Sequence, residues 1–381
     1  MNQTASRVLE EARQLEREGA MSQACRLLEA FLARDPLNAP VNSLLIRLLA
    51  DQGDWAGFGE VMQRFIRLQN HPLPIEAYEL GLLDLRLGIM PRGWLGYESR
   101  LQCPGLIGPV RTFSQPRWDG APFLGKTLLI HYEQGLGDTF MFVRYAAKAK
   151  ALGGRVLLAV QSALADVAAT CPGVDEVVPH GRPLPPFDIQ VSLLSLPSLF
   201  RTELNTIPAE VPYLDVPERV PNRQQIAALL GASEGQIRIG LVWAGSSTHV
   251  RDAERSLPPS LLAPLAAIPG VAWHSFQLEA RESPVLPGLV PLDPYIRNFS
   301  DTAYALSGMQ LVITVDTALA HLAGAMGIPT MLLVAFFPDF RWMMGREDSP
   351  WYPSMRIYRQ SSPGDWTTVV QRLAADLMGE S

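Results

Sequence analysis

The chain is poor in cysteine, in long apolar runs and in positive charge. Its three cysteines, Cys25, Cys103 and Cys171, are far apart and lack the spacing of a metal site, which favours a reducing, cytoplasmic compartment. No apolar run approaches the roughly 18 residues of a membrane-spanning helix. The first twenty residues read as a charged helix and not as a secretory signal peptide. The net charge of −6 argues against general nucleic-acid binding, which uses a basic face.

Residues 1–103 show helical periodicity throughout, with breakers at regular intervals. Apolar residues recur at helical spacing in stretches such as QACRLLEAFLA and VNSLLIRLLA. Gly19, Gly53 and Gly88 lie 34 and 35 residues apart. A repeat of about 34 residues, made of two helices with a glycine at the turn, is the tetratricopeptide signature. Such repeats stack into a curved surface that binds a peptide or packs on a neighbour. An irregular helical bundle is the alternative.

The rest of the chain predicts a linker followed by two α/β domains. Residues 104–125 are rich in proline and glycine and lack periodicity, as a linker does. Strands alternate with helices over residues 126–220 and again over 221–381, with helices expected at 139–153 and 260–268. This alternation predicts two parallel sheets. Because such sheets bind ligands at the carboxyl ends of their strands, two facing sheets place the site in the cleft between them.

The stretch LVITVDTALAHLAGAMGIPTMLL, residues 311–333, is the strongest local pattern. A buried strand ends at Asp316, a helix begins at once, and His321 lies one turn into it. A helix N-terminus offers free N–H groups and a positive dipole end, which favour phosphate. His321 can add a hydrogen bond to a phosphate oxygen, and Asp316 can accept hydrogen bonds from sugar hydroxyls. Alternatively, Asp316 caps the helix and His321 is a core histidine.

A second loop combines small hydroxyl residues with cations. The stretch GLVWAGSSTHVRDAERSL runs from a strand into Gly245 and Ser246, followed by His249, Arg251 and Arg255. These residue types at the carboxyl end of a strand suit a leaving group that carries phosphate. The alternative is a solvated surface loop.

A third loop holds an acidic residue between a buried strand and an amphipathic helix. In YEQGLGDTFMF, Gly135 and Gly137 permit a tight turn, and Asp138 follows where the helix starts. Asp138 can cap that helix or be held over a cleft to take a proton, and the two roles do not exclude each other.

Four stretches resemble one family of enzymes, the tetratricopeptide-repeat glycosyltransferases of bacteria, which are similar to the lipopolysaccharide heptosyltransferases. They are EQGLGDTFMFVRY, IGLVWAGS, VDTALAHLAGAMGIPTMLL and FRWMMGREDSPWYPSMRIYRQ. The resemblance covers nearly the whole chain and is specific over about the last 140 residues and at 133–145. It implies an α + α/β architecture in which N-terminal helical repeats precede the GT-B pair of Rossmann-like domains. It also implies an inverting transfer from a nucleotide sugar, without a metal or other cofactor.

The resemblance assigns residues as well. The acidic residue of the family's glycine-rich first loop, its proposed catalytic base, matches Asp138, and Glu133 is the alternative base. The family's D-T-x-x-x-H segment, which holds the donor diphosphate on its backbone amides, matches Asp316 to His321. The donor-binding residues that we expect are Gly135, Gly137, Gly245, Ser246, His249, Arg255, Gln277, Leu278, Asp316, Thr317, Ala318, Leu319 and His321.

The chain departs from this family at one loop. Relatives often carry an asparagine-containing G-N-x-x-H stretch where this chain has GSSTHVRDAERS, although His249 and Arg255 keep their places. The heptosyltransferase loop with a phosphate-binding lysine has no matching lysine here, so Arg251 or Arg255 would serve instead. This difference leaves the identity of the donor open.

Two further stretches are candidates for the cleft. WHSFQLE ends a strand where a nucleotide base lies in this fold, so the backbone atoms of Gln277 and Leu278 are candidates. FFPDFRWMMGREDSPWYPS is both aromatic and charged. It either shapes the cleft floor through Asp339, Arg341 and Trp342 or packs as a segment that crosses between the domains.

Two functions of different classes fit these patterns. The first is a glycosyltransferase whose acceptor is a protein, such as flagellin or another surface protein, or a surface glycan. The second is a repeat adaptor whose transferase half has lost activity. The adaptor should lose the base or the diphosphate helix, and the chain keeps both, which favours the enzyme. We expect either to work in the cytoplasm, with a peripheral place at the inner membrane as the alternative.

Overall fold

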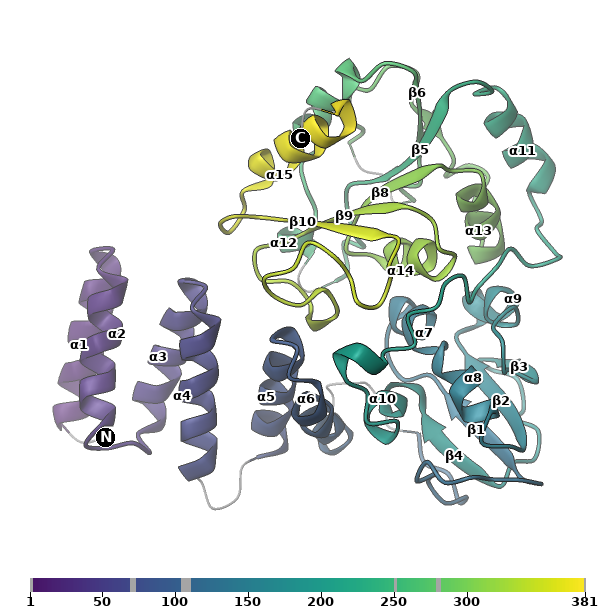
Figure 1. Cartoon of the computed structure of the whole chain (residues 1–381). Coiled ribbons are helices and arrows are strands. Elements are labelled where there is room, and N and C mark those ends of the chain that lie inside the picture. Colours follow the sequence, from purple (N-terminus) through teal and green to yellow (C-terminus); the bar gives the residue numbers. More distant parts are fainter. Residues whose placement is uncertain (1–2, 69–72, 104–110, 250–251, 279–281, 380–381) are drawn as a thin grey trace. The chain divides into compact units, whose positions relative to one another are not determined.

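The chain divides into two compact units, residues 1–109 and 110–381 (Figure 1). The structure is a computed structural model, and it describes all of the chain except residues 1–2, 69–72, 104–110, 250–251, 279–281 and 380–381. No helix among the residues thus described is both long and apolar enough to cross a bilayer.

Helices alone build the described part of the first unit. They follow one another as α1 (Gln3–Arg17), α2 (Met21–Leu32), α3 (Ala39–Asp51), α4 (Trp55–Leu68), α5 (Pro74–Arg86), α6 (Met90–Tyr97) and the 3-10 helix η1 (Glu98–Gln102). Gly19, Gly53 and Gly88 stand at the turns after α1, α3 and α5, with φ of 76°, 72° and 77°. Glycine adopts this left-handed conformation without steric cost. The expectation that this part of the chain is helical is confirmed, and its tetratricopeptide character stays a prediction.

The second unit begins with a four-stranded parallel sheet in the order β3-β2-β1-β4. Its strands are β1 (Thr127–His131), β2 (Arg155–Val160), β3 (Glu176–Pro179) and β4 (Ile189–Ser192). Ile130 in β1 lies opposite Leu158 in β2 and Val191 in β4, and all three are buried. The helices of this first lobe are α7 (Leu136–Phe142), α8 (Tyr145–Lys150), α9 (Ala165–Ala168) and α10 (Leu196–Leu199).

The second lobe carries a six-stranded parallel sheet in the order β10-β9-β8-β5-β6-β7. Its strands are β5 (Ile237–Val242), β6 (Val271–Ser275), β7 (Val290–Pro291), β8 (Leu311–Val315), β9 (Thr330–Val334) and β10 (Met355–Arg359). Its α-helices are α11 (Arg223–Gly231), α12 (Asp252–Arg255), α13 (Phe299–Ser307), α14 (Ala318–Ala325) and α15 (Trp366–Met378). The expectation of two parallel-sheet α/β domains is therefore confirmed.

Two of the expected helices differ in the structure. The helix expected at 139–153 is interrupted between α7 and α8, where the Nε of Arg144 donates to the carbonyl of Met141 at 2.8 Å. A continuous helix would direct that carbonyl to the amide of residue 145. The helix expected at 260–268 is the 3-10 helix η5 (Pro259–Ala267), which contains Pro264. Proline lacks an N–H and crowds the preceding turn, so it disfavours an α-helix here.

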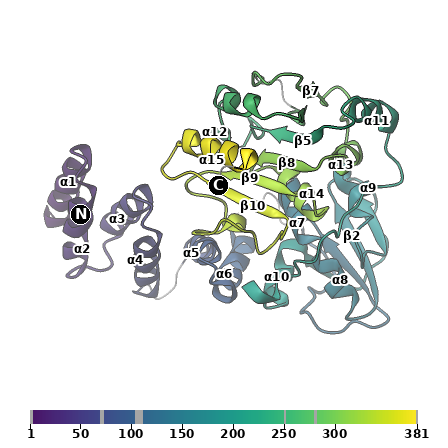
Figure 2. The ribbon, with the colours of Figure 1, turned by 45° about the horizontal axis from the view of Figure 1, so that its top comes forward.

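A buried arginine ties the two lobes together. Arg144 donates to the carbonyl of Trp351 at 2.6 Å and to the hydroxyl of Tyr213 at 2.7 Å. Its guanidinium also lies over the rings of Tyr213 and Tyr352, at 4.5 and 4.6 Å from their centroids. These contacts fix α7 of the first lobe beside α14 of the second, as Figure 2 shows.

Candidate active site

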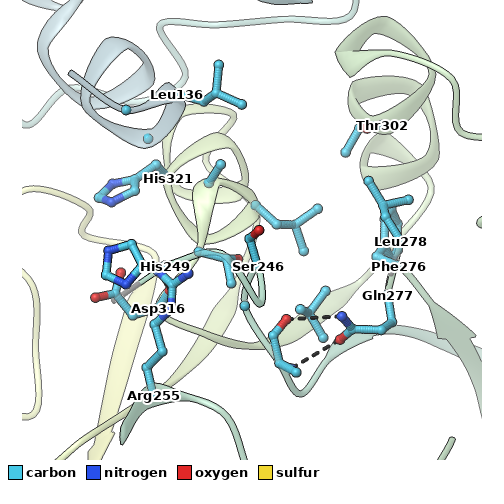
Figure 3. Close-up of a pocket in the computed structure, with 18 of the residues that line it drawn as sticks. Leu136, Ser246, His249, Arg255, Phe276, Gln277, Leu278, Thr302, Asp316 and His321 are labelled. Atoms are coloured by element: carbon cyan, nitrogen blue, oxygen red, sulfur yellow. Dashed lines mark hydrogen bonds between the residues drawn. The ribbon is translucent and has the colours of Figure 1, made fainter. Parts of the chain in front are cut away.

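A cavity of about 420 Å³ opens where the loop after β1 meets the second lobe. The loops that follow β5 and β6, the start of α14 and the segment before Arg341 form its other walls. All the described residues expected at the site line this cavity except Glu133 and Trp342. Charged and imidazole side chains, including Asp316, Arg255 and His249, gather at one end, whereas Phe276, Leu278 and Thr302 lie at the other (Figure 3).

Helix α14 points its N-terminus into the cavity. Buried strand β8 ends at Val315, and Thr317 is the N-cap residue, in an extended conformation, whose side chain accepts no hydrogen bond from the helix. Asp316 is therefore not the cap, contrary to one of the two readings of the sequence. Ala318 and Leu319, at the first turn, line the cavity. Their small or apolar side chains leave the backbone amides of the helix start accessible to an anion.

His321 is held by contacts on three sides. Its Nδ1 lies 3.0 Å from the hydroxyl of Tyr352, and its ring stacks on Trp342 with centroids 4.9 Å apart. A Cβ added to Gly137 would lie 2.6 Å from its Cδ2, so α7 and α14 approach closely only because residue 137 is glycine. Burial lowers the pKa of His321 to about 3, so the imidazole is neutral at physiological pH. Its Nε2 makes no hydrogen bond to any of the described residues.

Asp316 lies beneath the helix start, where its surroundings disfavour the ionised form of its carboxyl. Burial raises the pKa of its carboxyl to about 6, and the neighbouring carboxylate of Asp339 adds to the increase. Trp342 and the guanidinium groups of Arg341 and Arg255 act in the opposite direction. The carboxyl is thus evenly divided between its charged and neutral forms near pH 6.

Arg255, at the end of α12, supplies a cation beside the helix start. Its Nη1 donates to the backbone carbonyl of Asp316 at 3.1 Å. A Cβ on Gly245 would lie 2.5 Å from the guanidinium, so a larger residue in this loop would displace the end of the Arg255 side chain. The amide of Gly245 donates to the hydroxyl of Ser256 at 2.9 Å, which fixes the loop. Arg251, the other candidate for this role, lies outside the described residues.

Gln277 lines the cavity, and its side chain has a structural contact that the sequence did not indicate. Its Nε2 donates to the carbonyl of Ala244, and its Oε1 accepts from the amide of Ala244, both at 3.1 Å (Figure 3). This clamp joins the segments that follow β5 and β6 and uses one donor and one acceptor position of the side-chain amide. Leu278 is 57% exposed and, with Phe276, forms an apolar wall.

The side of the cavity beneath α13 was not expected from the sequence. Ile296, Phe299 and Thr302 line it, and they come from the loop before α13 and from its first turns. The stretch FSDTAYALSGM predicted a helix but carried no sign of which face meets a ligand.

Asp138 stands at the third position of α7, whose N-cap residue is Gly135. Its Oδ2 accepts from the amide of Gly135 at 2.7 Å, and its Oδ1 accepts from Nη2 of Arg341 in the second lobe. Asp138 thus lies in the first turn of the helix, as expected, and although the N-cap residue is Gly135, the carboxylate of Asp138 accepts from its amide. Burial raises the pKa of Asp138, and the charge of Arg341 lowers it.

Glu133, the alternative base, has a hydrogen-bond partner within the first lobe. The hydroxyl of Ser192, at the end of β4, donates to its Oε1. It is absent from the described residues that line the cavity. Among the two acidic candidates in this loop, only Asp138 therefore contacts the space where a ligand would bind.

The architecture defines the class. Two parallel-sheet α/β lobes that share one cavity at the carboxyl ends of their strands are the arrangement of the GT-B glycosyltransferase fold. Among solved structures, the family 9 glycosyl transferase from Veillonella parvula is 13% identical, covers 69% of this chain and 100% of its own, and has a TM-score of 0.50. The ADP-heptose lipopolysaccharide heptosyltransferase II of E. coli is also 13% identical; the match covers 67% of this chain and 99% of the E. coli protein, with a TM-score of 0.46. At this identity the likeness is one of fold.

The curated proteins include one particular relative. Protein FlbA of Caulobacter vibrioides is 30% identical over 324 residues, which is 77% of this chain and 53% of FlbA. The chain thus spans about half the length of this relative. No protein-family model matches the chain.

Proposed function

We propose that the chain is a glycosyltransferase that moves a sugar from a nucleotide-sugar donor to an acceptor hydroxyl, with inversion at the sugar carbon and without a metal. One observation carries this proposal. A single cavity joins a helix N-terminus and Arg255, which suit a diphosphate, to the carboxylate of Asp138, which can take a proton. The GT-B fold supports it as an architecture on which such transfers occur.

The cavity also suits the orientation of such a donor. In the proposed orientation the nucleoside lies against Phe276, Leu278 and Thr302, whose side chains Figure 3 draws at one end of the cavity, and the diphosphate reaches the start of α14. The acceptor oxygen attacks the anomeric carbon while the bond from that carbon to the diphosphate oxygen breaks. The acceptor proton passes to Asp138, the general base. The leaving diphosphate is stabilised by the helix amides and Arg255.

The test of this proposal is a thermal-shift and calorimetric screen of the full chain against a panel of nucleotide sugars. A donor present at 100 times its dissociation constant should stabilise the fold by roughly 2.7 kcal/mol. Arg255→Gln should weaken its binding, whereas Arg372→Gln, at a site that is 42% exposed and bonded to Glu347, should not. Failure of every nucleotide sugar and nucleoside diphosphate to bind would favour the adaptor without enzymatic activity.

The absence of a metal requirement is a prediction of its own. Because Arg255 and α14 supply positive charge to the leaving group, transfer should continue at the same rate in excess EDTA. Single-turnover cleavage of the donor, with and without chelator, measures this. Loss of the rate that only Mn²⁺ or Mg²⁺ restores would mean that a cation carries the leaving-group charge.

In this proposal the first unit binds the acceptor. Its helices, with left-handed glycines at comparable turns, support tetratricopeptide-like repeats that bind a protein acceptor, such as flagellin or another surface protein. A surface glycan is the alternative acceptor. The reaction would take place in the cytoplasm or at the inner face of the membrane.

A further inference from the structure

Arg341 joins carboxylates from the two lobes. Its Nη2 donates to Oδ1 of Asp138 in α7, and its Nη1 donates to Oδ1 of Asp339 at 2.6 Å. All three residues line the cavity, and the side chains of Arg341 and Asp138 are only 9% and 13% exposed. Residues 138 and 341 are distant in sequence, so this pair exists only in the folded second unit.

Residues of both lobes restrain the guanidinium of Arg341. Arg341 lies in the 3-10 helix η6 (Phe340–Trp342), and Asp339, its N-cap residue, accepts from the amide of Arg341 at 3.0 Å. The guanidinium lies over the rings of Phe340 and Phe142, at 4.3 and 5.8 Å from their centroids. A side chain so restrained can orient its partner as well as neutralise it, because a guanidinium donates in a fixed planar geometry.

The carboxylate of Asp138 is therefore fixed at both oxygens. The amide of Gly135 donates to Oδ2, and Arg341 donates to Oδ1. An ionised carboxylate accepts about four hydrogen bonds, so lone pairs remain available to a substrate hydroxyl. The arrangement orients these lone pairs without using all of them.

The charges around Asp138 act against one another. Burial is the largest influence and raises its pKa, and the carboxylates of Asp339 and Glu133 add to this. Arg341 is the largest opposing influence, followed by the amide of Gly135. His321, in the helix packed on α7, is neutral because its own pKa is lowered to about 3. Arg341 is thus the cation that favours an ionised Asp138.

We propose that Arg341 is the positioning residue for the base: it keeps the carboxylate of Asp138 ionised and oriented across the junction of the two lobes. This inference rests on the proposed function, since it assigns a partner to the base of that reaction. Asp339 completes the arrangement by holding the second edge of the guanidinium.

The experiment compares the full chain with Arg341→Gln, Arg341→Lys and the control Arg346→Gln. Arg346 is nearby in sequence, is 35% exposed and pairs with Asp348 outside the cavity. Donor binding is measured by calorimetry, and single-turnover donor cleavage is measured from pH 5.5 to 8.5. The rate falls at low pH as Asp138 becomes protonated, and this acidic limb of the pH–rate profile should move to higher pH in Arg341→Gln, because the cation that favours the ionised carboxylate is gone. The ratio of the rates at pH 8 and pH 6 should therefore rise by about tenfold.

Arg341→Lys should restore the position of the acidic limb, because lysine keeps the charge, while lowering the rate at its plateau, because it loses the fork geometry. Arg346→Gln should match the parent. The double variant Asp138→Asn with Arg341→Gln should have the same pH–rate profile as Asp138→Asn alone. This comparison shows whether the shift arises from Asp138 or from His321, because Arg341 also lowers the pKa of His321.

The outcomes separate the inference from the function on which it rests. A parent chain that binds and cleaves no donor overturns the proposed function. A parent that cleaves donor, with an Arg341→Gln variant that melts normally and keeps the acidic limb in place, overturns the role of Arg341. If Arg341→Gln does not fold, Arg341→Lys decides: an unchanged plateau rate in that variant overturns the orienting role.

Discussion

At the scale of single residues, the two oxygens of Asp138 have different partners. One satisfies an amide of its own helix, and the other pairs with a cation of the facing lobe. The sequence allowed Asp138 to be a cap, a base or both, and in the structure the capping contact leaves the carboxylate in the cavity. The two roles are therefore compatible. They can be separated only by a substitution that keeps the shape of the side chain and removes its ability to take a proton.

Asp138→Asn is that substitution. Asparagine can still accept from the amide of Gly135, but it cannot take a proton, so single-turnover transfer should fall by about 10²–10⁴-fold. Its melting temperature should fall modestly, because Arg341 loses a charged partner but keeps Asp339. Asp188→Asn is the control, since Asp188 also accepts from a backbone amide, that of Thr127, outside the cavity. A large loss in Glu133→Gln with a normal rate in Asp138→Asn would make Glu133 the base.

Asp316 predicts a pH dependence of stability. Its folded pKa, about 6, lies above the ordinary value of 3.8, so the folded protein binds this proton more tightly than the unfolded chain does. Between about pH 4 and pH 6 the unfolded chain has lost the proton and the folded protein still holds it. The free energy of unfolding therefore falls as pH rises through this window and levels off above it.

Asp316→Asn removes this fall, because asparagine does not titrate. The melting temperature of the variant, relative to the parent, should rise between pH 4 and pH 7 in thermal denaturation curves. Asp293→Asn, at an exposed position in the same lobe, should show no such trend. Equal pH dependence in the parent and in Asp316→Asn would show that the carboxyl is not destabilised by burial.

At the scale of elements, the close approach of α7 and α14 builds the site. Gly137 in the first helix faces His321 in the second, and Tyr352 and Trp342 prevent the imidazole from moving aside. The helix that carries the base and the helix that offers its amides to an anion are thus set by one contact. A change at this contact should affect stability and binding together.

Gly137→Ala tests this contact. The added Cβ would lie 2.6 Å from His321 Cδ2, and such overpacking costs about 1–3 kcal/mol. We expect a lower melting temperature and weaker donor binding by calorimetry. Gly231→Ala, where an added Cβ meets nothing within 4 Å, should leave both unchanged or stabilise the chain slightly. Normal melting and binding by Gly137→Ala would mean that the two helices have room to separate.

Local sequence predicted the elements better than their pairings. Three of the loops expected in the cleft follow β5, β6 and β8, and the carboxyl ends of these parallel strands meet at one edge of a sheet, so their convergence could be foreseen. The loop after β1 comes from the other sheet, and its place followed from the expectation that the two sheets face each other. The bond between Arg341 and Asp138 could not be foreseen, because it depends on how two lobes dock. The break in the helix at Arg144 has the same origin, since that side chain bonds to Trp351 in the other lobe.

At the scale of the whole molecule, each unit has features of an independent part. The first has its own apolar core, in which Leu28, Leu45 and Leu48 are fully buried. The second contains every residue that lines the cavity. Donor chemistry and acceptor recognition can therefore reside in different units of one chain.

The last prediction concerns this division. A chain of residues 110–381 should bind the donor with the affinity of the full chain and should hydrolyse it slowly with water, because the cavity is complete within it. The same chain should fail to glycosylate the acceptor, because the repeats that we propose to recruit it are gone. Calorimetry measures the first property, and incorporation of labelled sugar into acceptor from cell extract measures the second. A melting curve shows whether the shortened chain is folded. Residues 1–109, added in excess, should inhibit transfer by the full chain, since they compete for the acceptor. Full transfer by folded residues 110–381 would place acceptor recognition in the second unit, at the cavity itself.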